Sequence, residues 1–127
     1  MQVLIVDTSI RVIERLEEII SEAENITFIH KAFSNEEAKK LLTENNYDVV
    51  LLDIGLQGKE SLKLLKEIKK TGGETCVIVL SIHTDNYIRA YCKSLGADFF
   101  FDKYHDFEKI SGLLCSISFI NANKRFG

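Results

Sequence analysis

The stretch Asp48 to Leu62 reads DVVLLDIGLQGKESL, and this stretch decides the fold. Val49 to Leu52 is an unbroken apolar run, which is typical of a strand buried on both faces of a parallel sheet. Asp53 follows where the strand ends, and a loop with Gly55 and Gly58 precedes a helical segment. Open α/β sheets bind ligands at the carboxyl ends of their strands. Asp53 is therefore a candidate functional carboxylate, with capping of the next turn as its alternative role.

On both sides of this stretch, short apolar runs alternate with amphipathic segments. The predicted strands cover residues 3–6, 26–32, 49–52, 76–82 and 98–102. Apolar residues at helical spacing follow each strand, in segments 12–23, 34–44, 61–70, 85–95 and 107–120. Five strand–helix units in strict alternation predict an α/β fold, a doubly wound parallel sheet with five helices and right-handed crossovers.

Several helix ends carry recognisable capping residues. Ser34 with Glu37 three residues later forms a capping box, and Thr84 or Asp85 can cap the fourth helix. Gly96 ends that fourth helix, and the pair Gly72 and Gly73 ends the third. The last series of apolar residues at helical spacing ends near residue 120, so we expect one domain over 1–120 and a short polar tail over 121–127.

Composition places the chain among ordinary globular domains. Its 127 residues are 46% hydrophobic with a formal net charge of −3, and the basic residues are scattered among acids. We therefore expect no direct nucleic-acid binding. No apolar run reaches the ~18 residues of a membrane span, and no signal peptide precedes the first strand, so we expect a cytoplasmic protein. Three cysteines, odd in number and far apart, are expected as buried thiols.

Five side chains are expected together at the carboxyl edge of the sheet, namely Asp7, Thr8, Asp53, Ser81 and Lys103. Two neighbouring carboxylates repel each other and favour a divalent cation, and Mg²⁺ prefers few carboxylates, waters and phosphate oxygens. An ammonium and a hydroxyl beside them would neutralise charge on a phosphoryl group in transfer. The set predicts an aspartate that accepts a phosphoryl group.

Residues 3–120 resemble the response-regulator receiver domains of two-component signalling. The resemblance rests on IVDT (5–8), LLDIGLQGKES (51–61), VIVLSIH (77–83) and GADFFFDK (96–103). It implies a flavodoxin-like sheet of order 2-1-3-4-5. It also implies Mg²⁺ as cofactor, with Asp53 as phosphoacceptor and metal ligand, Asp7 as metal ligand and the Gly55 backbone carbonyl as a further ligand.

The resemblance assigns the remaining positions as well. Ser81 corresponds to the switch hydroxyl, Phe100 to the switch aromatic and Lys103 to the phosphate-binding lysine. His83 stands where receivers set the rate of phosphoryl hydrolysis, so it is either a modulating residue that shields or orients water or an exposed loop histidine.

Three positions depart from the family pattern. Thr8 replaces the second of two adjacent acids, which predicts a weakened metal site. Gln57 stands where the loop usually has a proline, and Tyr104 stands where a cis proline usually follows the lysine. Because a cis bond before a residue other than proline costs ~2.5–4 kcal/mol, we expect a trans peptide between Lys103 and Tyr104.

The resemblance also implies partners. These are a histidine kinase or phosphotransfer protein as donor and a downstream protein target, with a possible homodimer through the fourth helix, fifth strand and fifth helix. We expect Phe99 to be partly exposed and to join Tyr87 or Tyr104 in a contact patch. With no output domain in the chain, output would pass through protein contacts of a stand-alone receiver. Catalysis would be limited to its own phosphorylation and dephosphorylation at Asp53.

Three other functions fit parts of the pattern. A degenerate receiver that docks a partner without phosphorylation is suggested by Thr8. A flavodoxin-like flavin binder would need a glycine in the first loop, DTSIRV (7–12), which has none. A haloacid-dehalogenase-like phosphatase would need a second acid where Gly55 stands.

Overall fold

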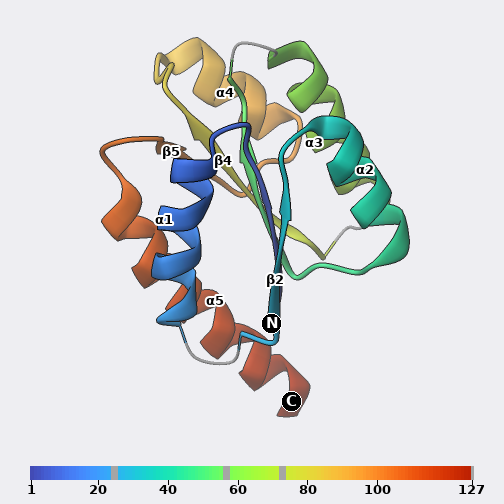
Figure 1. Cartoon of the computed structure of the whole chain (residues 1–127), viewed down its shortest axis with the longest axis vertical. Coiled ribbons are helices and arrows are strands. Elements are labelled where there is room, and N and C mark those ends of the chain that lie inside the picture. The colour runs from blue at the N-terminus through green and yellow to red at the C-terminus, as the bar shows by residue number, and fades with distance from the viewer. Residues whose placement is uncertain (24–25, 56–57, 72–73, 127) are drawn as a thin grey trace.

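The computed structural model describes residues 1–23, 26–55, 58–71 and 74–126, the last ten of these through their backbone alone. Its strands are β1 (Gln2–Val6), β2 (Phe28–Ala32), β3 (Val49–Asp53), β4 (Cys76–Ser81) and β5 (Phe99–Asp102). Its helices are α1 (Ile10–Ser21), α2 (Asn35–Glu44), α3 (Gly58–Thr71), α4 (Asn86–Ser94) and α5 (Phe107–Phe126). A parallel sheet lies between two helical layers, with α1 and α5 on one face and α2, α3 and α4 on the other (Figure 1).

The sheet has the strand order β2-β1-β3-β4-β5, as predicted. Each neighbouring pair is parallel, and the central strand β3 lies in register with β1 and β4, so that Leu52 is opposite both Val6 and Val79. The β2 and β5 strands form the two edges. This order places the carboxyl ends of β1 and β3 side by side, which is where their terminal acids meet.

The sheet is buried on both faces in its centre, as the unbroken apolar runs indicate. Every residue from Val49 to Leu52 is fully buried. Because side chains of a strand alternate between faces, Val49 and Leu51 pack with α1 and α5, whereas Val50 and Leu52 pack with α3 and α4. The two halves of the core are thus built from alternate residues of the same strands.

Several predicted boundaries differ from the structure. Strand β2 begins at Phe28 rather than at residue 26, β5 begins at Phe99 rather than at 98, and β4 ends at Ser81 rather than at 82. Helix α3 begins at Gly58, earlier than residue 61. Helix α5 continues to Phe126, so residues 121–126, expected as a polar tail, extend the helix. Gln57, Gly72 and Gly73 lie outside the described residues, as do the side chains of residues 117–120.

The N-terminal caps of α2 and α4 are formed by predicted residues, but one hydrogen bond of the α2 capping box involves a different backbone N–H. Ser34 caps α2 by accepting a hydrogen bond from the Glu37 N–H at 3.1 Å. Glu37 accepts its return bond from the N–H of Phe33 at 3.0 Å instead of from Ser34, so the box closes one residue earlier than expected. Asp85, not Thr84, caps α4 and accepts from the Ile88 N–H at 2.9 Å.

The cysteine prediction is correct for one residue. Cys92 is buried, Cys76 is half-buried and Cys115 is exposed, so the expectation of a buried thiol is wrong for Cys115. Burial, with a smaller contribution from the charge of Asp98, raises the pKa of the Cys76 thiol to about 12. Within the described residues, no helix combines the length and apolar character that crossing a bilayer requires.

The turn between α4 and β5 is tied to α3 by charged side chains. Lys69 on α3 binds the Asp98 carboxylate at 2.9 Å and the Thr75 carbonyl at 2.9 Å. The same Asp98 oxygen accepts the Val77 N–H at 2.8 Å. Gly96 lies in this turn with φ of +106°, and a Cβ there would be 2.8 Å from Cγ of Lys69. Both the backbone conformation and the close approach of Lys69 therefore favour glycine.

We predict that Gly96→Ala lowers the free energy of unfolding by about 1–3 kcal/mol, because alanine is strained at positive φ and its Cβ displaces the Lys69 stem. Urea denaturation followed by circular dichroism measures the change. Gly112→Ala is the matched control, because Gly112 lies inside α5 and a Cβ added there would meet no atom within 4 Å. Alanine there should add about 1 kcal/mol through helix propensity. Equal stability of Gly96→Ala and the parent would contradict this explanation.

Candidate functional site

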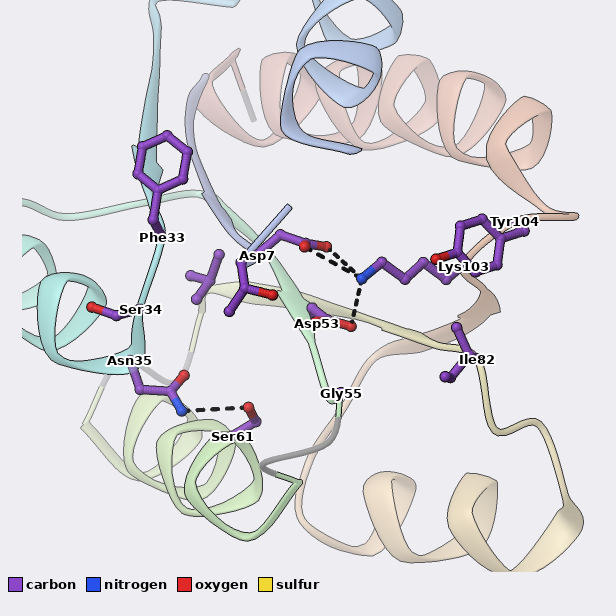
Figure 2. A pocket seen from close by; sticks show the side chains of 12 residues that line it. Asp7, Phe33, Ser34, Asn35, Asp53, Gly55, Ser61, Ile82, Lys103 and Tyr104 are labelled. Carbon is purple, nitrogen blue, oxygen red and sulfur yellow. Dashed lines mark hydrogen bonds and ion pairs between the residues drawn. The ribbon is translucent and has the colours of Figure 1, made fainter. Parts of the chain in front are cut away.

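The carboxyl edge of the sheet brings three charged side chains together. Asp7 directly follows β1, Asp53 is the last residue of β3, and Lys103 directly follows β5. The backbone N–H of Asp7 donates to the Ala32 carbonyl, and that of Lys103 donates to the Ser81 carbonyl at 2.9 Å. These bonds extend the parallel ladders past the strand ends. The side chains are thereby aimed into one space above the sheet (Figure 2).

The ammonium of Lys103 lies between the two carboxylates. Its Nζ is 3.0 Å from Oδ2 and 3.3 Å from Oδ1 of Asp7, and 3.2 Å from Oδ1 of Asp53. Asp7 and Lys103 are only 3% and 7% exposed. Asp7 is further oriented by the Ser9 N–H, which donates to its Oδ1 at 2.8 Å. With all three groups ionised, the cluster carries one net negative charge.

Burial and the neighbouring charges shift the pKa values of Asp53 and Lys103. Burial, and then the charge of Asp7, raises the pKa of Asp53, and Lys103 only partly opposes this rise. Burial lowers the pKa of Lys103, but the hydrogen bond to Asp7 and the charges of Asp53 and Asp7 outweigh it, so the net shift is upward. Lys103 is therefore charged, whereas burial and the nearby Asp7 carboxylate make the ionised form of Asp53 less favourable than in water.

Two carboxylate oxygens of the cluster lack hydrogen bonds. Among the described residues, Oδ2 of Asp7 and Oδ1 of Asp53 are buried side-chain oxygens that have the ion pair with Lys103 but no further hydrogen-bond partner. Gly55 leaves room beside them, since a Cβ there would be 3.0 Å from Oδ2 of Asp53. Two carboxylates with free lone pairs and an open side fit a hard cation such as Mg²⁺.

Thr8 does not supply a third carboxylate. It is exposed and lines the same cavity as Asp7 and Asp53. Within the described residues, no group of three or more histidine, cysteine or acidic side chains is arranged to hold a metal. The protein ligands available to a cation here are thus two carboxylates, supplemented by neutral oxygens.

The charged cluster forms one end of a cavity of about 530 Å³. Figure 2 shows Phe33, Ser34 and Asn35 on one side of it and Ile82, Lys103 and Tyr104 on the other. Asn35 donates a hydrogen bond to the Ser61 hydroxyl at 3.5 Å, which joins α2 to α3 beside the cavity.

The structure does not bring every predicted site residue into the cavity. Ser81 is fully buried, and its hydroxyl donates to the His83 carbonyl at 2.8 Å and accepts the His83 N–H at 3.0 Å. Neither Ser81 nor the exposed His83 side chain lines the cavity. Phe100 is half-buried, with the Arg89 guanidinium 4.8 Å above its ring.

Two further expectations about this edge are confirmed. Among the described residues no peptide bond is cis, so the bond between Lys103 and Tyr104 is trans. Phe99 is 37% exposed and stacks on Phe101. The two rings alternate with Phe100 along β5 and belong to the α5 side of the sheet, whereas Tyr87 is on α4. A contact patch that includes Phe99 and Tyr87 would therefore have to wrap around the sheet edge.

Sequence reasoning missed six residues that line the cavity: Val6, Phe33, Ser34, Asn35, Ser61 and Ile82. Ser61 and Asn35 carried no signal, because polar residues near helix starts are common. The sequence predicts Ile82 at the end of a strand, whereas β4 ends at Ser81 and Ile82 is exposed in the following loop. An apolar residue directly after a strand that ends in a site hydroxyl is the signal that could have identified it.

Comparison with known protein families and with individual proteins gives response regulators in both cases. A family model described as the response regulator receiver domain matches residues 3–114. The response regulator UvrY of Escherichia coli is 30% identical over 95 residues, covering 75% of this chain and 44% of UvrY. The chain thus spans less than half the length of that relative.

Solved receiver domains share the fold. The signal receiver domain of a DNA binding response regulator from Colwellia psychrerythraea superposes with a TM-score of 0.84 at 21% identity, covering 93% of this chain and 98% of that one. The response regulator domain of Thermotoga maritima CheB is 27% identical, with a TM-score of 0.76 and 93% of each chain covered. With the family match over residues 3–114 and two acids facing a lysine at the sheet edge, this chain belongs to the response regulator receiver domains of two-component signalling.

Proposed function

We propose that the chain accepts a phosphoryl group on Asp53 from a histidine kinase or phosphotransfer protein and signals through protein contacts in the cytoplasm. The observation that carries this proposal is the position of Lys103, whose Nζ lies 3.2 Å from Asp53 and 3.0 Å from Asp7 beside an open cavity. Asp53 is the only one of the two acids that belongs to the central strand β3, at the ligand-binding edge.

Transfer requires an oxygen of the Asp53 carboxylate to form a bond to phosphorus while the bond from phosphorus to the donor breaks and the donor leaves with that electron pair. Lys103 is placed to contact the equatorial oxygens and neutralise their charge. A bound Mg²⁺ would supply the positive charge that the cluster lacks. Asp7, Asp53 and the Gly55 carbonyl would hold it, with waters completing the shell.

Ser81 and Phe100 would act in the response to phosphorylation. To reach a phosphoryl oxygen, the Ser81 hydroxyl has to give up its bond to the His83 carbonyl. Phe100 lies under Arg89 at the edge strand, where the Arg89 guanidinium also donates to the Phe100 carbonyl at 3.4 Å. Movement of the β4–α4 loop would therefore alter the surface of α4 and β5, which is our proposed site for target docking or homodimer contact.

A second candidate function is docking without phosphorylation. Thr8 favours it, because this exposed residue leaves the cation site with one carboxylate fewer than the family pattern has. The two functions differ in whether Asp53 is modified, and this difference is measurable.

We predict that incubation with acetyl phosphate and Mg²⁺ adds roughly 80 Da, the mass of one PO₃H unit, and that Asp53→Asn abolishes the gain because its amide is not a nucleophile for phosphorus. Intact-mass spectrometry measures it. Asp85→Asn is the matched control, since it makes the same chemical change at an exposed cap that asparagine also fills. Phosphorylation that persists in Asp53→Asn would exclude the assignment, and an unmodified parent would favour the docking function.

We predict that Asp53→Asn increases the free energy of unfolding at neutral pH when Mg²⁺ is absent. The raised pKa of Asp53 means that its ionised form is less favourable in the fold than in the unfolded chain, so the parent loses stability as pH rises through that pKa. The amide avoids this loss. Urea titrations in EDTA across the acidic to neutral range should show the advantage of the variant shrinking towards the ordinary carboxyl pKa of 3.8. A parent more stable than the variant at neutral pH would contradict this reasoning.

We predict that Thr8→Asp tightens Mg²⁺ binding on the order of tenfold, because one added charge at ~4 Å is worth about 1 kcal/mol in water and more near a protein surface. Calorimetry measures the affinity, and acetyl phosphate titrations should show half-maximal phosphorylation at lower Mg²⁺. Thr8→Asn tests whether charge rather than size is responsible, and it should resemble the parent. If Thr8→Asp changes neither quantity, Thr8 does not face the metal.

A further inference from the structure

A second cavity, of about 550 Å³, lies between α2 and α3, which run side by side over one face of the sheet (Figure 1). Its lining includes Tyr47 and Thr75, which lie just before β3 and β4, so the cavity is beside the amino edge of the sheet and away from Asp53. Among the described lining residues, none also lines the charged cavity. The volume falls within the roughly 300–1,000 Å³ that small-molecule sites occupy.

The floor of this second cavity is apolar. Leu64, Ile68 and Tyr47 line it and are at most 5% exposed, and Leu42 beside them is half-buried. The Tyr47 hydroxyl is hydrogen-bonded to Nδ1 of His30 at 2.7 Å, which fixes the orientation of the tyrosine ring. The floor can therefore cover the apolar body of a small molecule.

The neutral polar groups around the floor already use most of their hydrogen atoms. The hydroxyls of Thr43 and Thr71 donate to backbone carbonyls of their own helices at 2.7 and 2.9 Å, and Thr75 donates to the Tyr47 carbonyl at 2.9 Å. The Asn45 amide donates to a carbonyl of α2 at 3.2 Å. Because a hydroxyl has a single hydrogen, these three hydroxyls can only accept from a ligand, which suits a ligand with N–H donors.

The position of the cavity adds negative potential. Thr43 and Asn45 are at the carboxyl end of α2, and Thr71 is the last residue of α3. The carboxyl ends of helices carry unsatisfied carbonyls and partial negative charge, so they favour cations. Glu67 adds a full negative charge, since it lines the cavity and has no ion pair among the described residues.

One positive side chain competes with a bound cation. Lys39 is the only lysine or arginine among the described lining residues, and it is exposed, so it can extend into solvent. Lys69, in the last turn of α3, does not line the cavity, because its ammonium is held by the Asp98 carboxylate and the Thr75 carbonyl, both at 2.9 Å. The charge balance of the cavity thus depends on Glu67 and Lys39.

We propose that the cavity between α2 and α3 binds a small organic ammonium ion with an apolar body. The body packs on Leu42, Leu64 and Ile68, and the ammonium donates to Glu67 and to hydroxyl oxygens at the helix ends. An anion of the same shape is repelled by Glu67 and by the helix carbonyls. This site is separate from Asp53 and does not depend on the function proposed for it.

The test compares three compounds that share one apolar body and differ in charge: phenethylamine, phenethyl alcohol and phenylacetate. Each is titrated into the protein while proton–nitrogen correlation spectra are recorded. We expect the amine to cause saturable shifts of the backbone resonances of Asn45, Tyr47, Thr71 and Thr75. The alcohol should bind several-fold more weakly, because it retains the apolar contacts without the charge, and phenylacetate should bind most weakly.

Two variants test the charges separately. Glu67→Gln should weaken binding of the amine several-fold, and Lys39→Gln should strengthen it several-fold, whereas neither should change binding of the alcohol. Both residues are exposed, so the fold should be retained. Glu14→Gln is the matched control, because it removes the same charge from an exposed position of α1, on the opposite face of the sheet. It should bind the amine as the parent does.

Equal amine affinity of Glu67→Gln and the parent overturns the proposal, as does binding of phenylacetate as tight as that of the amine. Amine-induced shifts centred on Asp7 and Asp53 would place the amine at the carboxyl edge and would also overturn it. Movement of the Asn45 and Thr71 resonances with protein concentration alone would identify a second copy of the chain as the occupant of the cavity, again against the proposal.

Discussion

A buried ammonium between two carboxylates is the interaction on which the site depends. Lys103 comes from the last strand, and Asp7 and Asp53 come from the first and third, so no local segment could assemble the cluster. Burying any one of these charges alone would be strongly unfavourable. Pairing with Lys103 reduces that penalty, but burial and, after it, the negative charge of Asp7 still leave Asp53 with a raised pKa. The site is therefore short of one positive charge, and a net negative cluster of this kind favours a bound cation.

The remainder of the fold serves to hold these three residues at one edge. Strands buried on both faces place their carboxyl ends in a row, and the ladder bonds that continue past β1 and β5 fix the backbone of Asp7 and Lys103. The loops around that row are free to differ in chemistry. Here they supply an amide and hydroxyl groups beside α2 and α3 and apolar side chains at Ile82 and Tyr104. The charged residues of the cavity thus come from the ends of the strands, whereas its exposed apolar residues come from the loops that follow the strands.

The β4–α4 connection links the site to the surface. Ser81 is fully buried, yet its hydroxyl is engaged by the backbone of His83 and not by the cavity. The same loop carries Ile82 into the cavity and leads to α4, where Arg89 covers Phe100. A group bound at Asp53 that attracts the Ser81 hydroxyl would therefore act on the β4–α4 connection. This short segment also contributes Ile82 to the cavity and leads into α4. Coupling through this loop needs no long chain of contacts.

The sequence by itself determined the strand and helix order, the burial of the central strand, and the pairing of Asp7 and Asp53 with Lys103. These features can be predicted from the spacing of apolar residues within each segment and from the polar residues that follow each strand. Both can be read from short stretches of sequence. The tertiary structure decided where Ser81, Ile82 and His83 lie relative to the cavity, and that Thr8 is exposed. Strand β4 ends at Ser81 instead of one residue later, so Ile82 belongs to the following loop, and it is Ile82 that lines the cavity. Which residue of the β4–α4 loop enters the cavity is decided only in the folded protein, because the conformation of the loop depends on contacts with elements distant in the sequence.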